Sequence, residues 1–539
     1  MNHAMLLDCT LRDGAYLIDK KFGDTTIHGI INGLQKTGID IIEIGFLQDD
    51  GFGEGKTVFK NSLDAEKFVP ADKGDTLYAV LADFCRYSID NLDNYTGKSF
   101  DAVRACFFKK ERYEVLEFCK QVKAKGYKLF VQPVDILGYT DTEIIEFVNL
   151  VNAIEPYCFS IVDTFGSMYV DDLQRVYSLI DHNLVSTSKI GFHSHNNMQM
   201  SSALSQEFLK MTFGKREVVV DTTLSGMGRG AGNTPTELVA QYMVSKLGYS
   251  YDIDAMLDII DEYMDNIRSR CSWGYDTHYF IAGAYSAHVN NIAYLKKKNS
   301  IRYKDIRYIL NKIGAVPRKR YDYDLLDNTY IDYLNSDIDD SKAIAELKAT
   351  LGNKNIVLIA PGATAKTCAD KINQYVKDNN AVVITVNFMY DDVKSDYMYF
   401  SNVRRYEYWK NDEKFSDVAK IVTSNVTTAP QNDETVVSFT NLVKCGWEHM
   451  DNSAILSLRL LDTLGVKSIA IAGLDGYDYK TSDTNYVSQE MELSNVSIES
   501  LLLNEEIKEM LKDFIDTKTG KEDILFITPS RFESVIGGK

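Results

Sequence analysis

Up to about residue 250, short apolar runs rich in β-branched residues alternate with longer stretches of helical pattern, with a repeat of roughly 30 residues. Such alternation favours parallel strands joined by helical crossovers. Eight units of this kind predict an α/β fold of the (β/α)8 barrel type. An open doubly wound sheet is the structural alternative, but it seldom repeats so evenly. The expected strands span residues 5–9, 40–46, 76–82, 101–107, 128–134, 158–163, 189–193 and 217–223.

The rest of the chain divides by pattern into three parts that follow a barrel over 1–250. Residues 251–315 have helical pattern and predict a helical extension. Residues 316–349 are polar and acidic, which is typical of a linker region. Residues 350–539 predict a second α/β domain with an open, Rossmann-like sheet, because 355–388 has the order strand, tight turn, helix, strand.

The composition of this chain of 539 residues disfavours several classes of binding partner. Its formal net charge of −18 disfavours nucleic acid and anionic membranes, whose phosphates require Lys and Arg. No apolar run is long enough to cross a bilayer, and the N-terminal residues lack the pattern of a signal peptide. The eight cysteines include no C-x-x-C pair, so neither a disulfide framework nor a thiolate zinc site is expected. We expect a cytoplasmic protein that acts on small molecules; a homo-oligomer stays open.

The first expected strand runs directly into the polar turn "DCTLRDGAY" (residues 8–16). On its own, an Arg-Asp-Gly turn is most simply a strand end whose charges face water. In a parallel barrel, however, the carboxyl ends of the strands build the active site. The strand ends of this chain hold the side chains that we expect to meet a substrate or a metal: Arg12, Asp13, Glu43, Asp163, Thr164, His193 and His195.

The segment "GFHSHNN" (191–197) carries the sharpest local signal. Residues i and i+2 of a strand point to the same face, so His193 and His195 can present two imidazoles to one ion. Asp13, at the same end of the barrel, can supply a carboxylate. This set leaves positions open for water and a chelating substrate. Mn²⁺ or Mg²⁺ is expected rather than Zn²⁺, because no thiolate is at hand; a solvated or core histidine pair is the alternative.

Four motifs in the same order resemble a known family. "DCTLRDGAY", "IIEIGF", "GFHSHNN" and "SGMGRGAGN" are similar to the metal-dependent lyases whose first strand ends in Asp-x-Thr-Leu-Arg-Asp-Gly. That superfamily includes 4-hydroxy-2-oxovalerate aldolase, 3-hydroxy-3-methylglutaryl-CoA lyase and the isopropylmalate synthases. The aldolase branch fits best, because "AGAYSAH" (282–288) resembles it as well, and the resemblance covers about residues 4–300.

The resemblance implies a metal centre and a reaction. Asp13, His193 and His195 would be the divalent-metal ligands, and Asn233 would lie near the metal. A 2-oxo acid would chelate the metal, which acts as a Lewis acid. A base would remove the 4-hydroxyl proton, and cleavage of the C3–C4 bond would release pyruvate enolate and an aldehyde.

Three further positions concern the substrate and the proton. By the same resemblance, Arg12 would stabilise the enolate oxygen and Tyr285 would line the substrate pocket. Bacterial aldolases of this branch place a His base three residues after the metal Asp, where this chain has Tyr16. A phenol titrates near 10, so we expect Tyr16 to hydrogen-bond a bound hydroxyl or water while another group moves the proton. The CoA-ester lyases carry a reactive cysteine in their glycine-rich loop, and residues 225–233 contain none.

In the C-terminal part, "LIAPGATAK" (358–366) sets a tight turn between a strand and a helix. Amides at a helix N-terminus favour anions, so a phosphate is expected near Gly362 to Thr364; the alternative is that Thr364 is a helix N-cap. The region also loosely resembles a Rossmann-like family that includes bacterial sialyltransferases and pterin diphosphokinase-like proteins. That resemblance implies that Gly362, Thr364 and Asp475 lie near a nucleotide.

The leading hypothesis is therefore a divalent-metal-dependent aldolase, a carbon–carbon lyase that cleaves or forms a 4-hydroxy-2-oxo acid. Its products would be pyruvate and an aldehyde. One alternative is a Claisen-type enzyme of the same superfamily that uses an acyl-CoA. The other is a catalytically decayed barrel that serves as a scaffold for a nucleotide-binding C-terminal domain. The intact Arg12 and metal-ligand set count against decay, whereas Tyr16 counts for it.

Overall fold

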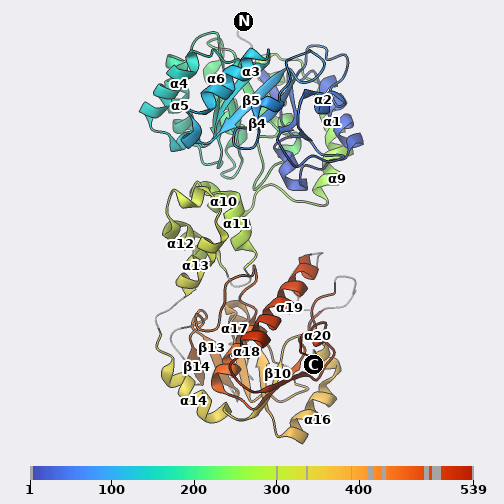
Figure 1. Cartoon of the computed structure of the whole chain (residues 1–539), viewed down its shortest axis with the longest axis vertical. Helices are drawn as coiled ribbons and strands as arrows, with labels where there is room; N and C mark the ends of the chain where they lie inside the picture. The colour runs from blue at the N-terminus through green and yellow to red at the C-terminus, as the bar shows by residue number, and fades with distance from the viewer. Residues whose placement is uncertain are drawn as a thin grey trace. The chain divides into compact units, whose positions relative to one another are not determined.

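The computed structural model describes residues 4–298, 301–334, 338–389, 391–410, 412, 415, 417–427, 433–478, 485–488 and 499–536. The chain forms two compact units, Met1–Ile292 and Ala293–Lys539 (Figure 1). Within the described residues, no helix combines the length and the apolar character needed to span a membrane.

In the first unit, parallel strands close into a barrel, because β1 pairs with both β2 and β9. The short strand β3 (Val58–Phe59) pairs with the carboxyl-terminal residues of β2, Phe46 and Leu47. All the strands expected from the sequence are present, and the predicted (β/α)8 barrel is confirmed. Its strands are β1 (Ala4–Asp8), β2 (Ile41–Leu47), β4 (Leu77–Asp83), β5 (Ala102–Phe107), β6 (Lys128–Pro133), β7 (Cys158–Asp163), β8 (Lys189–Ser194) and β9 (Val218–Thr222).

Helices pack around the outside of the barrel (Figure 1). The helix α1 shows why: it buries Ile27, Ile30, Ile31 and Leu34, which recur at helical spacing and therefore share one face. The helices of this layer are α1 (Asp24–Lys36), α2 (Ser62–Glu66), α3 (Val115–Ala124), α4 (Asp141–Asn152), α5 (Val170–Asn183), α6 (Ser201–Thr212), α7 (Thr236–Tyr242), α8 (Ile253–Ile259) and α9 (Asp265–Arg268).

The interior of the barrel is layered along the strand direction. The layer nearer the amino ends is apolar and consists of Leu7, Cys9, Ile41, Ala79, Ala102, Phe130, Cys158 and Val219. Two residues further along several of the same strands, the inward positions become polar: Glu43, Arg104, Gln132, Ser160 and Asp221, all buried. Because side chains two apart share a face of a strand, this alternation turns the carboxyl end of the barrel into a buried polar floor beneath the candidate site.

Helices continue through the segments that follow the barrel. The helix α10 (Thr277–Ala284) belongs to the first unit, and α11 (Val289–Lys296) contains the boundary between the units. Beyond it lie α12 (Tyr303–Ile313), α13 (Tyr323–Leu334) and α14 (Ser341–Leu351), so the expected acidic linker region itself contains helices. The four-part division expected from the sequence stays a prediction.

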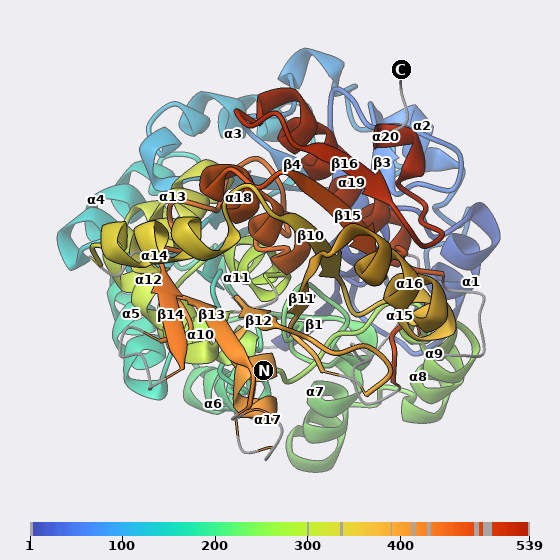
Figure 2. The same ribbon diagram turned by 90° about the horizontal axis from the view of Figure 1, so that it is seen from below.

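The second unit contains an open parallel sheet, as the sequence predicts. Its strands run in the order β14, β13, β12, β11, β10, β15, β16, an order that can be followed across Figure 2. The strands are β10 (Asn355–Ile359), β11 (Val382–Val386), β12 (Tyr397–Phe400), β13 (Ala419–Thr423), β14 (Glu434–Val437), β15 (Ser468–Ala472) and β16 (Asp523–Phe526). Its helices are α15 (Ala363–Thr367), α16 (Ala369–Asn379), α17 (Val403–Trp409), α18 (Ser453–Leu464), α19 (Glu499–Thr517) and α20 (Glu533–Ile536).

The strand β10 marks the point where the strand order reverses. The chain builds outward from β10 through β11 to β14, and then returns to place β15 on the other side of β10. At such a switch point the connections diverge to opposite faces of the sheet, which leaves a crevice at the carboxyl ends of the strands.

Candidate metal centre and C-terminal pocket

Asp13, His193 and His195 lie together at the carboxyl end of the barrel. Their potential ligand atoms are all within 4.8 Å of one another. His193 Nε2 is 3.5 Å from Asp13 Oδ2, and His195 Nε2 is 3.7 Å from Asp13 Oδ1. Asp13 and His193 are buried and His195 is half-buried. The structure therefore brings together the three residues that the sequence analysis selects as metal ligands.

Hydrogen bonds at the other ring nitrogens aim both imidazoles at Asp13. His193 Nδ1 lies 3.1 Å from Asp221 Oδ2, and His195 Nδ1 lies 3.0 Å from the backbone oxygen of Asp163. Since both partners are acceptors, each Nδ1 carries a proton, and a neutral ring then turns the lone pair of Nε2 toward Asp13. Lone pairs that converge on a carboxylate need a cation or protons between them, an arrangement typical of metal-binding histidines.

Arg12 keeps Asp13 charged. Its Nη1 donates to Asp13 Oδ2, and its Nε donates to Glu43 Oε2 at 2.7 Å. Burial opposes the ionisation of Asp13, but the positive charge of the Arg12 guanidinium holds the pKa of Asp13 well below its usual value. Asp13 is thus a carboxylate at neutral pH. No described residue accepts a hydrogen bond from Arg12 Nη2, so one edge of this guanidinium is available to a ligand.

A buried ion network supports these residues from below. Arg104, with no exposed surface, donates from Nη1 to Glu43 Oε2 at 2.9 Å and from Nη2 to Asp221. Glu43 thereby connects Arg104 to Arg12, and Asp221 connects Arg104 to His193. The sequence analysis missed Arg104 and Asp221. A charged residue inside an apolar strand, in register with inward-facing neighbours, was the available signal.

Asn233 contacts Asp13 through its amide nitrogen. Its Nδ2 donates to Asp13 Oδ1 at 3.1 Å and to the backbone oxygen of Met227 at 3.0 Å. Its Oδ1 is buried and accepts no hydrogen bond from the described residues. An unsatisfied buried acceptor costs about 1–3 kcal/mol, and a cation would satisfy it. Two imidazole nitrogens and a carboxylate therefore fit a divalent ion such as Mn²⁺ or Mg²⁺, and a ligand role for Asn233 stays a prediction.

The other predicted substrate residues are largely engaged with the protein. Glu43 is completely buried behind Arg12. Asp163 accepts hydrogen bonds from a serine hydroxyl and a backbone amide, and Thr164 Oγ1 accepts one from a backbone amide at 2.8 Å. Tyr285 is half-buried at the C-terminus of α10. These contacts give Glu43, Asp163 and Thr164 a positioning role; contact with substrate stays a prediction for all four.

Tyr16 lies between an apolar wall and two cations. Its ring contacts Phe46, with a centroid distance of 5.2 Å, and Arg229 Cζ lies 4.0 Å from the centroid of the Tyr16 ring. Burial raises the pKa of Tyr16 to about 12, even though Arg229 and Arg12 act in the opposite direction. The phenol is therefore protonated at neutral pH, which agrees with a hydrogen-bonding role and disfavours a general base.

His288 is a further residue near the centre that the sequence analysis missed. It lies between α10 and α11 and accepts a hydrogen bond at Nδ1 from the backbone amide of Asn290 at 3.1 Å. Burial, together with the positive charge of Arg229, lowers the pKa of His288 to about 4. The available signal was its position at the end of "AGAYSAH", a motif from which the resemblance implies a role for Tyr285 alone.

In the second unit, the predicted phosphate position is filled by the protein itself. Asp475, which follows β15, accepts hydrogen bonds from the backbone amide of Thr364 at 2.8 Å and from the Thr364 hydroxyl. Asp475 thus already occupies the amide of Thr364 at this turn, and a phosphate near Gly362 to Thr364 stays a prediction. The alternative, in which Thr364 is the helix N-cap, is wrong, because the N-cap of α15 is Gly362. A Cβ at Gly362 would lie 2.3 Å from the backbone oxygen of Gly473, which explains the glycine.

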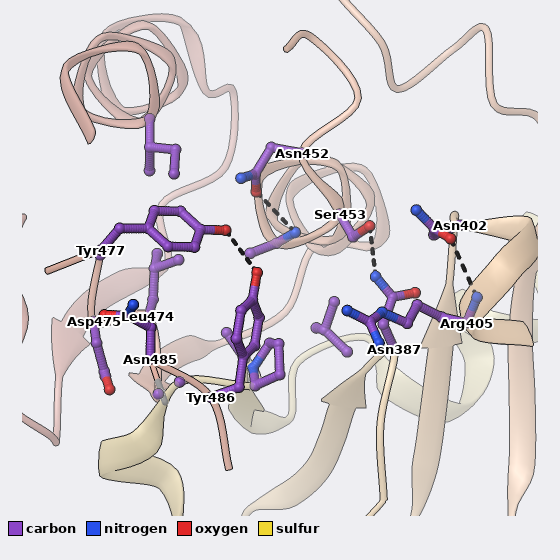
Figure 3. A pocket seen from close by; sticks show the side chains of 18 of the residues that line it. Asn387, Asn402, Arg405, Asn452, Ser453, Leu474, Asp475, Tyr477, Asn485 and Tyr486 are labelled. Carbon is purple, nitrogen blue, oxygen red and sulfur yellow. Dashed lines mark hydrogen bonds between the residues drawn. The ribbon is translucent and has the colours of Figure 1, made fainter. Parts of the chain in front are cut away.

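A pocket opens beside this turn, at the switch point of the sheet (Figure 3). Loops after β10, β11 and β15 and the N-terminus of α18 line it. Tyr477 and Tyr486 form one wall, with their hydroxyls 3.0 Å apart. On the opposite side, Asn387 Nδ2 donates to Ser453 Oγ at 2.7 Å, near Arg405. Gly362 and Asp475 lie at its edge, so two of the three predicted nucleotide residues border the pocket and Thr364 does not.

Comparison with known proteins agrees with this description of the first unit. Residues 3–261 match the family model described as HMGL-like. An oxaloacetate decarboxylase of Mycobacterium tuberculosis is 27% identical over 288 residues, which cover 50% of this chain and 79% of that protein. A 4-hydroxy-2-oxovalerate aldolase of Pseudoalteromonas translucida is 24% identical over 344 residues, which cover 60% of this chain and 94% of that protein. The HMG-CoA lyase structure from Brucella melitensis is 14% identical, with a TM-score of 0.41, and the match covers 50% of this chain and all of that one (100%).

Proposed function

We propose that this protein is a divalent-metal-dependent carbon–carbon lyase that cleaves, or in reverse forms, a 4-hydroxy-2-oxo acid to give pyruvate and an aldehyde. The observation that carries the proposal is the convergence of two Nε2 atoms on the Asp13 carboxylate, beside a guanidinium with one free edge. The match of the barrel to the HMGL-like model supports the same class of chemistry. Similarity to named aldolases supports the substrate class.

In this reaction the metal ligands and Arg12 would have separate roles. Asp13, His193, His195 and Asn233 would hold the ion, which when bound supplies Lewis acidity to a 2-oxo acid. Arg12 donates from its free Nη2 to the oxygen that gains negative charge as the C3–C4 bond breaks. A base takes the proton of the 4-hydroxyl, and the C4–O bond becomes the aldehyde carbonyl as the C3–C4 bond breaks. The electron pair of the broken bond passes into the enolate, and a proton added at C3 yields pyruvate.

The test is a substrate screen with the purified full chain and Mn²⁺ or Mg²⁺. 4-Hydroxy-2-oxo acids of varied chain length are supplied, and pyruvate is measured with lactate dehydrogenase. We expect release of pyruvate together with an equal amount of aldehyde, loss of both in His193→Ala, and no change in His182→Ala, whose histidine is exposed on α5. Absence of pyruvate from every compound would overturn the aldolase assignment.

Two further arms of the screen separate the alternatives. Oxaloacetate is included because the Mycobacterium tuberculosis relative is named as its decarboxylase; pyruvate with CO₂ in place of an aldehyde would favour that reaction. An acyl-CoA with a 2-oxo acid tests the Claisen-type alternative, which releases free CoA. Metal binding without any of these reactions would favour the decayed barrel that serves as a scaffold.

For the second unit, we propose that residues 350–539 bind a nucleotide or sugar nucleotide in the switch-point pocket. Support comes from its place at the carboxyl ends of parallel strands, where open α/β sheets bind ligands, and from its tyrosine wall and Arg405. Calorimetry of the full chain with nucleoside monophosphates, nucleoside diphosphates and CMP- or UDP-sugars tests it. Arg405→Ala is expected to weaken binding, and Arg404→Ala, the exposed neighbour on α17, is the matched control. No heat with any compound would favour a purely structural domain.

A further inference from the structure

Arg229 is fixed close to the candidate metal centre by the glycine-rich loop between β9 and α7. On one side, Gly228 packs so tightly that a Cβ there would lie 2.2 Å from Asn233 Nδ2, the atom that bonds Asp13. On the other side, Gly230 has a φ of +69° and a Cβ there would lie 2.8 Å from Asn197 Oδ1. The backbone at Arg229 is therefore held from both directions, and its side chain starts beside the metal ligands.

The guanidinium of Arg229 stacks on the ring of Tyr16, with Cζ 4.0 Å from the ring centroid. It is half-buried. The guanidinium groups of Arg12 and Arg104, by contrast, bond carboxylates. Within the described part of the chain, the side chain of Arg229 makes no hydrogen bond and no ion pair.

A half-buried guanidinium without a carboxylate partner is a receptor for an anion. Its planar fork matches a carboxylate or a phosphate, and stacking on an aromatic ring leaves the N–H edge free to donate. Arg229 also lies near the candidate metal ligands, because its ring partner Tyr16 follows Asp13 by three residues and its neighbour Gly228 packs against Asn233. A ligand that reaches the metal ligands and extends past Tyr16 would meet this edge.

We propose that Arg229 binds a second anionic group of the substrate, so that the aldehyde half of the preferred 4-hydroxy-2-oxo acid carries a carboxylate or a phosphate. The inference rests on the proposed function for its chemistry, but not for the binding itself. The 1-carboxylate and 2-oxo group occupy the metal side, the C3–C4 bond lies between, and the remote anion pairs with Arg229. Tyr16 then positions Arg229 through its ring, whichever part its hydroxyl plays.

The binding test uses the full chain with Mn²⁺ and unreactive 2-oxo acids. 2-Oxoadipate and 2-oxohexanoate have the same carbon chain and differ in whether it ends in a carboxylate or a methyl group; a 2-oxo acid that ends in a phosphate monoester forms the third arm. Calorimetry is expected to show about 10- to 100-fold tighter binding of an anionic ligand, the range for a hydrogen bond to a charged group. The anion that gains more identifies which of the two the subsite accepts.

Variants assign this preference to Arg229. Arg229→Met keeps the length of the side chain and is expected to abolish the preference while 2-oxohexanoate binds as before; Arg229→Lys is expected to restore part of it. Arg268→Met is the matched control, because Arg268 is exposed and stacks on Trp273, with Cζ 4.5 Å from the ring centroid. Equal affinity for charged and neutral ligands, or a preference that survives Arg229→Met, would overturn the inference.

Kinetics separates this inference from the proposed function. If wild type releases pyruvate equally well from neutral and anionic 4-hydroxy-2-oxo acids, the aldolase assignment stands and the Arg229 subsite falls. If no 4-hydroxy-2-oxo acid is cleaved but 2-oxo diacids bind in an Arg229-dependent manner, the subsite stands and the aldolase assignment falls. If both hold, the kcat/KM for the anionic substrate drops in Arg229→Met by the factor seen in binding, and that for the neutral substrate does not.

Discussion

The barrel and the C-terminal sheet are both built from parallel strands, and both carry their candidate sites at the carboxyl ends of those strands. In the barrel, closure makes the first strand a neighbour of the last, so residues after β1, on β8 and after β9 meet around Asp13. In the open sheet, the strand ends spread apart, and a pocket lies at the switch point beside β10.

The difference shows in the kind of side chain that each site contains. Closure places charged groups in a buried volume, where each needs a partner of opposite charge. In the barrel these groups form a continuous series of ion pairs: Asp13, Arg12, Glu43, Arg104 and Asp221. The open pocket is bordered by amides, tyrosines and loop backbone together with Arg405, Asp451 and Asp475, and its Asp475 carboxylate bonds a neutral threonine. Changes of charge should therefore be far more costly in the barrel than in the sheet.

The largest effect is expected from removing both imidazoles. In the double variant His193→Ala and His195→Ala, the ion loses two of its ligands, so bound metal and turnover should both be lost. Elemental analysis after gel filtration measures the metal, and circular dichroism checks the fold. Ligand binding to the C-terminal pocket should persist in the same protein. Stoichiometric metal in the double variant would disprove the assignment.

A large effect on rate alone is expected for Arg12→Ala. A guanidinium aimed at developing enolate charge acts mainly in the transition state, and loss of such a donor typically costs about 10²–10³ in kcat. Metal content should stay as in wild type, because Arg12 neighbours the ligand Asp13 without being one. Steady-state kinetics with metal analysis checks both points. A kcat near that of wild type would mean that Arg12 has no part in the chemistry.

A smaller effect is expected for Asp221→Asn, which alters the hydrogen bond at His193 Nδ1. Such changes behind a metal ligand typically cost 10–100-fold in metal affinity, so competition with a chelator should report a weakening of about that size. Asp475→Asn is the counterpart in the open sheet. It should leave metal affinity unchanged, because Asp475 belongs to the second unit. It should also keep the local structure, since an amide oxygen can still accept from Thr364. If Asp221→Asn binds metal as tightly as wild type, the buried network does not tune the centre.

The smallest effect is expected for Tyr16→Phe. Burial raises the pKa of Tyr16 to about 12, so the group is protonated below that pH and contributes no limb to the pH–rate profile in the neutral range. Turnover should fall only modestly, and the profile should keep its shape. Tyr16→His should keep or raise activity, since it places a group that titrates near neutrality at the same point. Complete loss of turnover in Tyr16→Phe, with disappearance of a pH-dependent limb, would show that Tyr16 is the base.

The sequence by itself determined the features that depend on local periodicity. The alternation of strands and helices located every barrel strand, and the spacing of His193 and His195 placed both imidazoles on one face, because side-chain direction follows from strand geometry alone. The open second sheet could be predicted for the same reason. The glycine-rich loop was found as a motif, although Arg229 within it, which stacks on Tyr16 without a carboxylate partner among the described residues, was not.

Only the tertiary structure decided which groups meet. Arg104 and Asp221 lie on strands that are far apart along the chain, and their contact depends on how far the strands are staggered when the barrel closes. The carboxylate at the turn before α15 comes from Asp475, more than a hundred residues away (|i−j| = 111). Arg229 contacts Tyr16 because the segment after β1 and the loop after β9, which are far apart along the chain, both lie at the carboxyl end of the barrel. Periodicity determines on which face of its helix or strand a side chain lies. Which side chains from distant parts of the chain come into contact depends on the closure and packing of the whole unit.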